Sequence, residues 1–140
     1  LMSEAAKGAG PPGTGVAMAG SLRGLGKLRS VLTPLSSGSV GSMLGEASQR
    51  IAGASTDAAG KAALFRAFAR QIDNATPNGF RFAEQAAADG SQVFTGRQNR
   101  VLVINPNGRV FRGTASDGLR VNDAGQTVVN FDKLKEVLPP

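Results

Sequence analysis

The clearest pattern of apolar and polar positions predicts a β-hairpin in the second half of the chain. Residues 100–104, Arg-Val-Leu-Val-Ile, form a continuous apolar run, which is typical of a central strand covered on both faces. The tetrapeptide Asn-Pro-Asn-Gly that follows predicts a tight turn, because Pro106 fixes φ and Gly108 is free to adopt a positive φ. Residues 109–114 then return as a strand antiparallel to the first.

Shorter apolar stretches on either side of this hairpin extend the predicted sheet. We expect one strand at 93–95 and a further strand at 127–131. The last apolar positions, within 132–138, predict a short closing helix with Asp132 as its N-cap.

Two helices are predicted before the sheet. Apolar residues three and four positions apart indicate a helix that ends near Asp73 and has Thr56 or Asp57 as its N-cap. A second helix is expected to begin with Thr76 as its cap and to end at Gly90. The apolar stripe of the first helix consists of Ala62, Phe65, Phe68, Ala69 and Ile72.

The first part of the chain also has helical spacing, but glycine interrupts it. Leucines recur three or four residues apart from Leu22 to Leu32, as do apolar residues from Val40 to Ile51. These stretches predict two short helices that glycine weakens, since each Gly costs about 1 kcal/mol relative to Ala.

A shift in composition predicts two parts of the chain. Residues 1–60 contain twelve of the 19 Gly and none of the seven Phe. We therefore expect a Gly/Ala-rich helical region at 1–53, for import or as a linker, followed by an α+β domain at 54–140. The predicted fold class is α+β, with N-terminal helices followed by a small twisted antiparallel sheet.

Composition excludes several kinds of active site. The 140 residues include no Cys, His, Trp or Tyr, which rules out Ser-His-Asp and Cys-His catalysis and thiolate metal sites. The carboxylates of the second part are scattered, so no metal site is predicted. The sequence Gly-Pro-Pro-Gly-Thr-Gly at 10–15 is followed by Val16 and Ala17, and it therefore lacks the Lys and Ser/Thr of a nucleotide-binding loop. We expect no cofactor.

The charge favours polyanionic partners. Sixteen Lys and Arg against ten Asp and Glu give a net charge of +6. Residues 91–120 carry five Arg and one Asp, a local charge of +4. Guanidinium groups match phosphate oxygens in pairs of hydrogen bonds, so these side chains can clamp a nucleic-acid backbone. They can equally be solvated charges that protect strand edges. The nucleic-acid-binding candidates are Arg66, Arg70, Thr95, Arg100 and Arg109.

RNA cleavage is compatible with this composition, because RNA supplies its own nucleophile in the 2′-OH. The protein then has to orient that group, stabilise the charged phosphorane and transfer protons, which Arg, Lys and carboxylates can do. The catalytic candidates are Lys61, Arg97, Arg112, Thr114 and Asp117.

The stretch 91–114, preceded by helices, resembles the C-terminal toxin domains of contact-dependent growth-inhibition proteins. It is similar in layout to the BECR superfamily of ribonucleases, which includes colicins that cut tRNA anticodon loops. The matching positions are Val93, Phe94, Asn99, Val101, Val103, Asn105, Gly108, Val110 and Phe111.

The resemblance implies a metal-independent ribonuclease toxin, acting on tRNA and neutralised by an acidic cognate immunity protein. It also implies export as part of a larger cell-surface protein and action in the cytoplasm of the target cell. No stable membrane insertion is expected, although a basic amphipathic helix in 1–53 can contact a membrane transiently during delivery. Two alternatives are a non-catalytic basic module that binds nucleic acid or an acidic protein, and an ADP-ribosyltransferase, whose Arg…Ser-Thr-Ser…Glu-x-Glu residues are not recognisable here.

Overall fold

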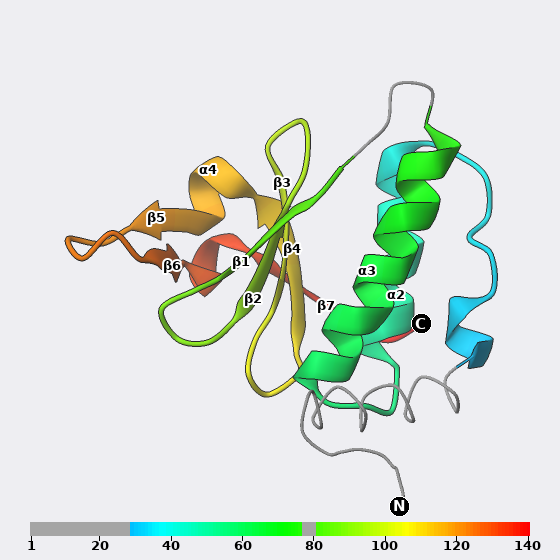
Figure 1. Ribbon diagram of the computed structural model, residues 1–140, viewed down its shortest axis with the longest axis horizontal. Coiled ribbons are helices and arrows are strands. Elements are labelled where there is room, and N and C mark those ends of the chain that lie inside the picture. Colours follow the sequence, from blue (N-terminus) through cyan, green and yellow to red (C-terminus); the bar gives the residue numbers. More distant parts are fainter. Residues whose placement is uncertain (1–28, 77–80) are drawn as a thin grey trace, which may run out of the picture.

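A computed structural model describes residues 29–76 and 81–140, where two helices precede a five-stranded antiparallel sheet and a small separate hairpin (Figure 1). The predicted α+β class is therefore confirmed. A 3-10 turn, η1, spans Arg29–Leu32, and the helices are α2, Val40–Ala52, and α3, Ala58–Ala75. Residues 22–28 of the leucine-rich stretch that is predicted as the first helix lie outside the described residues. The end of that stretch, residues 29–32, forms η1.

Both long helices begin at a side-chain cap. Ser39 Oγ accepts the backbone N–H of Ser42 at 3.1 Å, and Asp57 Oδ1 accepts that of Gly60 at 2.8 Å. Such caps satisfy N–H groups that have no partner within the first helical turn. The choice between Thr56 and Asp57 as the cap of α3 is thus settled in favour of Asp57.

The main sheet has the strand order β1-β2-β3-β4-β7, and each neighbouring pair is antiparallel. The central hairpin is as predicted, and Gly108 in its turn has a φ of +86°. The strands are β1, Ala83–Ala86; β2, Gln92–Thr95; β3, Arg100–Ile104; β4, Val110–Thr114; and β7, Lys135–Val137.

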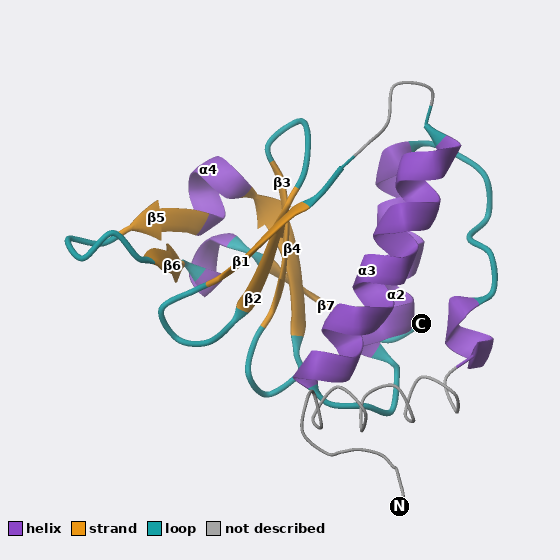
Figure 2. Cartoon of the chain, in the orientation of Figure 1, coloured by secondary structure: helices purple, strands orange, loops and turns teal. Residues whose placement is uncertain are grey.

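The sheet has an apolar cluster on each face, and the elements that cover the two faces lie on opposite sides of it (Figure 2). Helices α2 and α3 cover one face, where Phe94, Leu102 and Val110 pack against helical residues such as Ile51 and Phe65. A short helix, α4, at Ala115–Gly118 and a 3-10 turn, η2, at Phe131–Lys133 lie toward the other face. The apolar cluster on this other face consists of Ala87, Val93, Val101, Val103, Phe111, Ala115, Leu119, Val129, Phe131 and Leu134.

Helix α2 belongs to the main core. Met43, Leu44, Ala47 and Ile51 are all buried in the same cluster as the aromatic residues of α3. This core therefore draws on residues from both sides of the boundary that composition predicts at residue 53. No helix among residues 29–76 and 81–140 has the length and apolar character needed to cross a membrane.

The helix predicted from Thr76 to Gly90 is wrong where the structure describes it. Residues Ala83–Ala86 form β1, which pairs with β2 at the edge of the sheet. Alanine favours a helix by intrinsic propensity. All four β1 residues are exposed, however, so backbone pairing with β2 rather than side-chain packing determines their conformation. Residues 77–80 lie outside the described residues.

The closing helix predicted from Asp132 is also wrong. Only the single turn η2 is helical, and Lys135–Val137 forms β7, paired with β4 through Val110 and Val137. An unpaired β4 would present a row of backbone donors and acceptors to water, and β7 satisfies that edge. Val137 also packs against the main core.

The strand predicted at 127–131 ends at Val129 and lies outside the main sheet. It forms β6, Thr127–Val129, which pairs with β5, Leu119–Val121. We call residues 119–129 the β5–β6 arm, because this hairpin projects from the body of the molecule on the side opposite α2 and α3 (Figure 1).

Candidate functional site

An open cleft lies between α2, β4 and the segment that contains β7. Its volume is about 590 Å³, and it opens to solvent. The lining residues are Ser42, Gly45, Glu46, Ser48, Gln49, Arg112, Lys135, Glu136, Val137, Leu138 and Pro139. A cavity of about 200 Å³ shares Arg112 and Lys135 with this cleft and adds Arg100.

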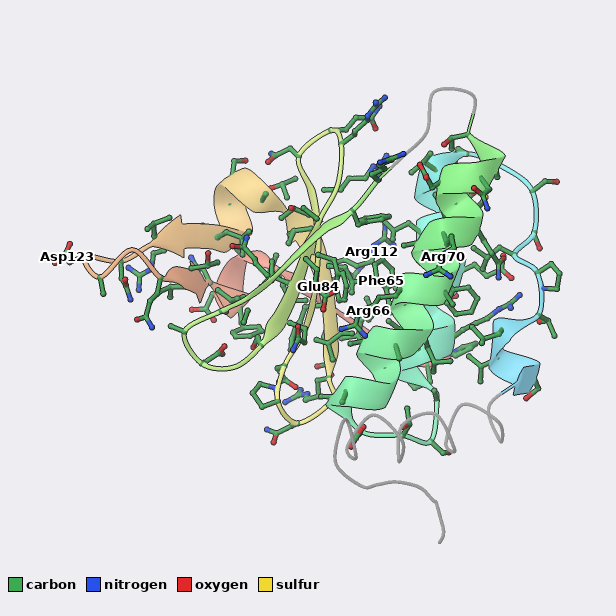
Figure 3. All side chains as sticks on the ribbon, in the orientation of Figure 1. Phe65, Arg66, Arg70, Glu84, Arg112 and Asp123 are labelled. Atoms are coloured by element: carbon green, nitrogen blue, oxygen red, sulfur yellow. The ribbon has the colours of Figure 1, made fainter. Side chains whose placement is uncertain are left out.

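The register of the sheet brings three cations together on the face that α2 covers. Arg112 on β4 is the direct cross-strand partner of Lys135 on β7 and of Leu102 on β3. Arg100 lies two residues before Leu102, and side chains two apart on a strand point to the same face. We call Arg100, Arg112 and Lys135 the cationic row (Figure 3 labels Arg112).

Two glycines of α2 lie next to the guanidinium groups of Arg100 and Arg112. A methyl group at Gly41 would lie 3.6 Å from Nη1 and Nη2 of Arg100, and one at Gly45 would lie 3.3 Å from Nη1 of Arg112. The helix thus contacts the cationic row at both positions, and at Gly45 the approach is closer than an ordinary Cβ contact allows. A Cβ atom at Gly45 would require the Arg112 guanidinium to shift slightly, because the contact is tighter than usual.

The positive charge of the row is costly in the free protein. Partial burial, and to a lesser extent the nearby charge of Arg100, lower the pKa of Arg112. Like charges directly opposite one another on neighbouring strands, as in Arg112 and Lys135, are destabilising. Within the described residues, no carboxylate forms an ion pair with any member of the row.

Arg100 has an unused hydrogen-bond donor at its Nε atom, which is buried without a partner among the described residues. Its Nη2 atom donates to Gln98 Oε1 at 3.2 Å. Gln98 and Asn99 have φ angles of 63° and 61°, a region in which non-glycine residues are uncommon. Positive φ angles at two successive residues are common in the turn of a β-hairpin, and this segment joins β2 to β3. The feature that a ligand could use is the unpaired Nε donor of Arg100.

The carboxylates that line the cleft have other partners. Glu46 accepts the backbone N–H of Ser36 at 3.0 Å and pairs with Arg50, and the bond from Ser36 is the main cause of its lowered pKa. Glu136 pairs with Arg109, whose Nη2 atom lies 2.6 Å from Glu136 Oε1, and this bond lowers the pKa of Glu136. Neither carboxylate therefore neutralises the cationic row.

Thr114 and Asp117 lie at the Arg100 end of the row. Thr114 is the cross-strand partner of Arg100, and its hydroxyl donates to Asp117 Oδ2 at 3.0 Å. Asn99 holds the adjoining segment, since its Oδ1 atom accepts the backbone N–H of Ser116 at 2.9 Å. Both Thr114 and Asp117 are exposed to solvent. Of the predicted candidates, the structure thus brings together Arg100, Arg112, Thr114 and Asp117.

Lys61 lies elsewhere and is buried. Its Nζ atom donates to the backbone carbonyls of Ala52 at 3.1 Å and Gly108 at 2.9 Å, and burial lowers its pKa. The ammonium group thereby joins the C-terminal end of α2 to the turn between β3 and β4. These bonds give Lys61 a structural position outside the lining of the cleft.

The other predicted residues are also separate from the cationic row. Arg66 on α3 forms two bonds, at 2.8 and 2.6 Å, to Glu84 on β1, which is the edge strand farthest from β7 in the sheet (Figure 3 labels both residues). Thr95 follows Phe94, which faces the helices, so Thr95 points to the opposite face of the sheet. Arg70 lines a separate cavity of about 210 Å³, Arg97 is exposed in the loop before β3, and Arg109 pairs with Glu136.

Sequence reasoning missed Ser42, Gln49 and Lys135. Ser42 and Gln49 belong to α2, which composition assigned to the region before the predicted domain, and Lys135 was assigned to a helix. The spacing of Gly41, Gly45 and Gln49 at every fourth position is the signal that could have indicated a contact face on α2.

Among the described residues, no group of three potential ligands lies close enough together to hold a metal ion. Comparisons with models of protein families, with curated proteins and with solved structures found no match.

Proposed function

We propose that the cleft binds the phosphate backbone of RNA and that the chain is a metal-independent endoribonuclease toxin, acting on tRNA. The observation that carries this proposal is the cationic row, which has no carboxylate partner among residues 29–76 and 81–140. A phosphate between Arg100 and Arg112 would relieve their mutual repulsion and use the buried Nε donor of Arg100.

Cleavage requires attack of the ribose 2′-oxygen on the adjacent phosphorus and departure of the 5′-oxygen. The products are a 2′,3′-cyclic phosphate and a 5′-hydroxyl. Arg100 and Arg112 would stabilise the additional negative charge of the phosphorane. Asp117, hydrogen-bonded to Thr114 beside Arg100, would accept the 2′-OH proton, and Lys135 would donate a proton to the leaving oxygen.

The proposal extends to delivery and neutralisation. We infer from the resemblance to growth-inhibition toxins that a larger cell-surface protein carries the chain to the cytoplasm of a target cell. The net charge of +6 suits an acidic immunity protein that covers the cleft.

A second candidate function is RNA binding without cleavage. Glu46 and Glu136, the carboxylates that line the cleft, are both held in ion pairs, which makes them poor proton acceptors. On this alternative, the cationic row is a binding surface only.

The test is a digest of tRNA by the full chain in the presence of EDTA, analysed on a denaturing gel. We expect discrete fragments with 2′,3′-cyclic phosphate ends, which Arg112→Ala and Asp117→Asn abolish. Arg120→Ala on the β5–β6 arm is the matched control and should cut normally. Intact tRNA that nevertheless binds the chain would establish the non-catalytic alternative, and the absence of both binding and cleavage would overturn the proposal.

A further inference from the structure

Gln49 lies on the same side of α2 as the two glycines that face the cationic row. Gly41, Gly45 and Gln49 are four residues apart, which places them in line along one side of a helix at intervals of about 6 Å. Arg100 lies against Gly41 and Arg112 against Gly45. The Gln49 side chain is therefore one helical turn beyond the place where a phosphate would bind.

The Gln49 amide is available to a ligand. It lines the cleft, is exposed, and forms no side-chain hydrogen bond to another residue of the described ranges. The amide carries a donor and an acceptor side by side. Each nucleobase presents a donor next to an acceptor on its pairing edge, so one base can form two bonds with this group.

The surrounding wall suits a flat base. Leu138 and Pro139 line the cleft together with Gln49, and Leu138 is 67% exposed. A volume of about 590 Å³ falls within the range of about 300–1,000 Å³ for small-ligand sites, which fits one nucleotide. None of the described lining residues is aromatic, so hydrogen bonding rather than aromatic stacking has to select the base.

We propose that Gln49 is the specificity-determining residue of the cleft and reads the base of an unpaired nucleotide whose phosphate lies on Arg100 and Arg112. This inference rests on the proposed RNA-binding function. The pairing edge of a base is free only in loops, bulges and single strands, and protein recognition of RNA sequence uses such sites. The substrate is thus single-stranded or loop RNA.

The experiment measures binding of the full chain to fluorescent 2′-O-methyl oligonucleotides of adenine, cytosine or uracil, which cannot be cut because the 2′-oxygen is blocked. A bidentate contact discriminates against the wrong base by about 1–3 kcal/mol, which is at least about fivefold in Kd. We expect the wild type to prefer one oligonucleotide by at least that factor. Gln49→Ala should bring the three Kd values together, and Gln49→Glu, which lacks the donor, should change their order.

The control variant is Gln126→Ala on the β5–β6 arm, which should keep the wild-type preference. Gln49 is exposed and Ala favours helices, so the Gln49→Ala chain should fold. If Arg112→Ala weakens binding to all three oligonucleotides while Gln49→Ala keeps the preference, the inference is overturned and the proposed function stands. Equal wild-type affinities would also overturn it. No binding by the wild type would overturn the proposed function as well.

Discussion

Leu102 and Arg112 are direct cross-strand partners in the sheet, yet Leu102 is fully buried and Arg112 is half-buried beside it. The charged Arg112 side chain is thus next to the apolar core, at the point where the α2 backbone at Gly45 comes close to its guanidinium group. The partial burial that disfavours the charge in the free chain also reduces the screening of its attraction to a bound anion.

Replacement of Arg112 should have opposite effects on the thermal stability of the chain and on its affinity for RNA. Arg112→Leu removes a partly buried charge that Arg100 and Lys135 repel, so we expect a higher melting temperature. RNA binding should weaken, and the salt dependence should fall by about 0.7 in log–log slope for one lost contact to a single strand. Calorimetry and anisotropy titrations at several salt concentrations measure the two effects.

Arg120→Leu is the matched control for this variant, because it removes the same charge from the arm. It should leave the binding of RNA nearly unchanged. A loss of affinity equal to that of Arg112→Leu would show that net charge, not the cleft, governs binding.

A Lys61→Met variant tests whether the buried ammonium group of Lys61 is structural or catalytic. Lys61→Met leaves the carbonyls of Ala52 and Gly108 without their donor, and an unsatisfied buried group costs about 1–3 kcal/mol. We therefore expect lower stability in urea denaturation, with RNA affinity and cleavage preserved well below the melting temperature. Loss of cleavage from a folded Lys61→Met chain would contradict this expectation.

Substitutions at Ile51 test whether α2 belongs to the same folding unit as α3 and the sheet. The Ile51 side chain is fully buried in the main core, so Ile51→Ala should destabilise the chain by about 2–5 kcal/mol and Ile51→Val by about 0.5–1.5 kcal/mol. A fragment of residues 54–140 lacks this helix and should show no cooperative thermal transition. A stable fragment would place α2 outside the folding unit.

The pair formed by Arg66 and Glu84 predicts a dependence of stability on pH. The hydrogen bonds from Arg66 lower the pKa of Glu84 below its ordinary value of about 4.5. The contribution of Glu84 is therefore present above about pH 4.5 and is lost as the pH falls through the lowered value. Glu84→Gln should reduce stability at neutral pH by no more than about 1 kcal/mol, because the pair is partly exposed.

Denaturation curves at neutral pH and at about pH 3 measure this difference, which should shrink in acid. Asp123→Asn is the control, since Asp123 lies at the tip of the β5–β6 arm (Figure 3) and forms no ion pair with the described residues. A difference for Glu84→Gln that is independent of pH would show that packing, and not charge, is responsible.

Elements with strong local signals could be predicted from the sequence. Helix α3 has a regular apolar stripe and the Asp57 cap, and the central hairpin has a buried strand followed by a proline–glycine turn. By contrast, β1 and β7 consist of four and three residues with no such signal. Their pairing with β2 and β4 determines their conformation, and no local pattern encodes that.

The site was predictable only in part, for the same reason. Alternation along β4 correctly places Arg112 and Thr114 on the face of Val110. Lys135 and Gln49 reach the cleft only because distant segments pack against β4. Their contribution depends on tertiary contacts that the spacing of residues within one segment does not contain.

The walls of the cleft come from nearly opposite ends of the described chain, namely α2 and the segment of β7. Ribosomes add residues from the N-terminus at about 5–20 per second, so α2 is made several seconds before β7. Until then β4 has no β7 partner, and Lys135 is not yet opposite Arg112. A nascent chain consequently has no complete cleft until β7 has been made and has paired with β4.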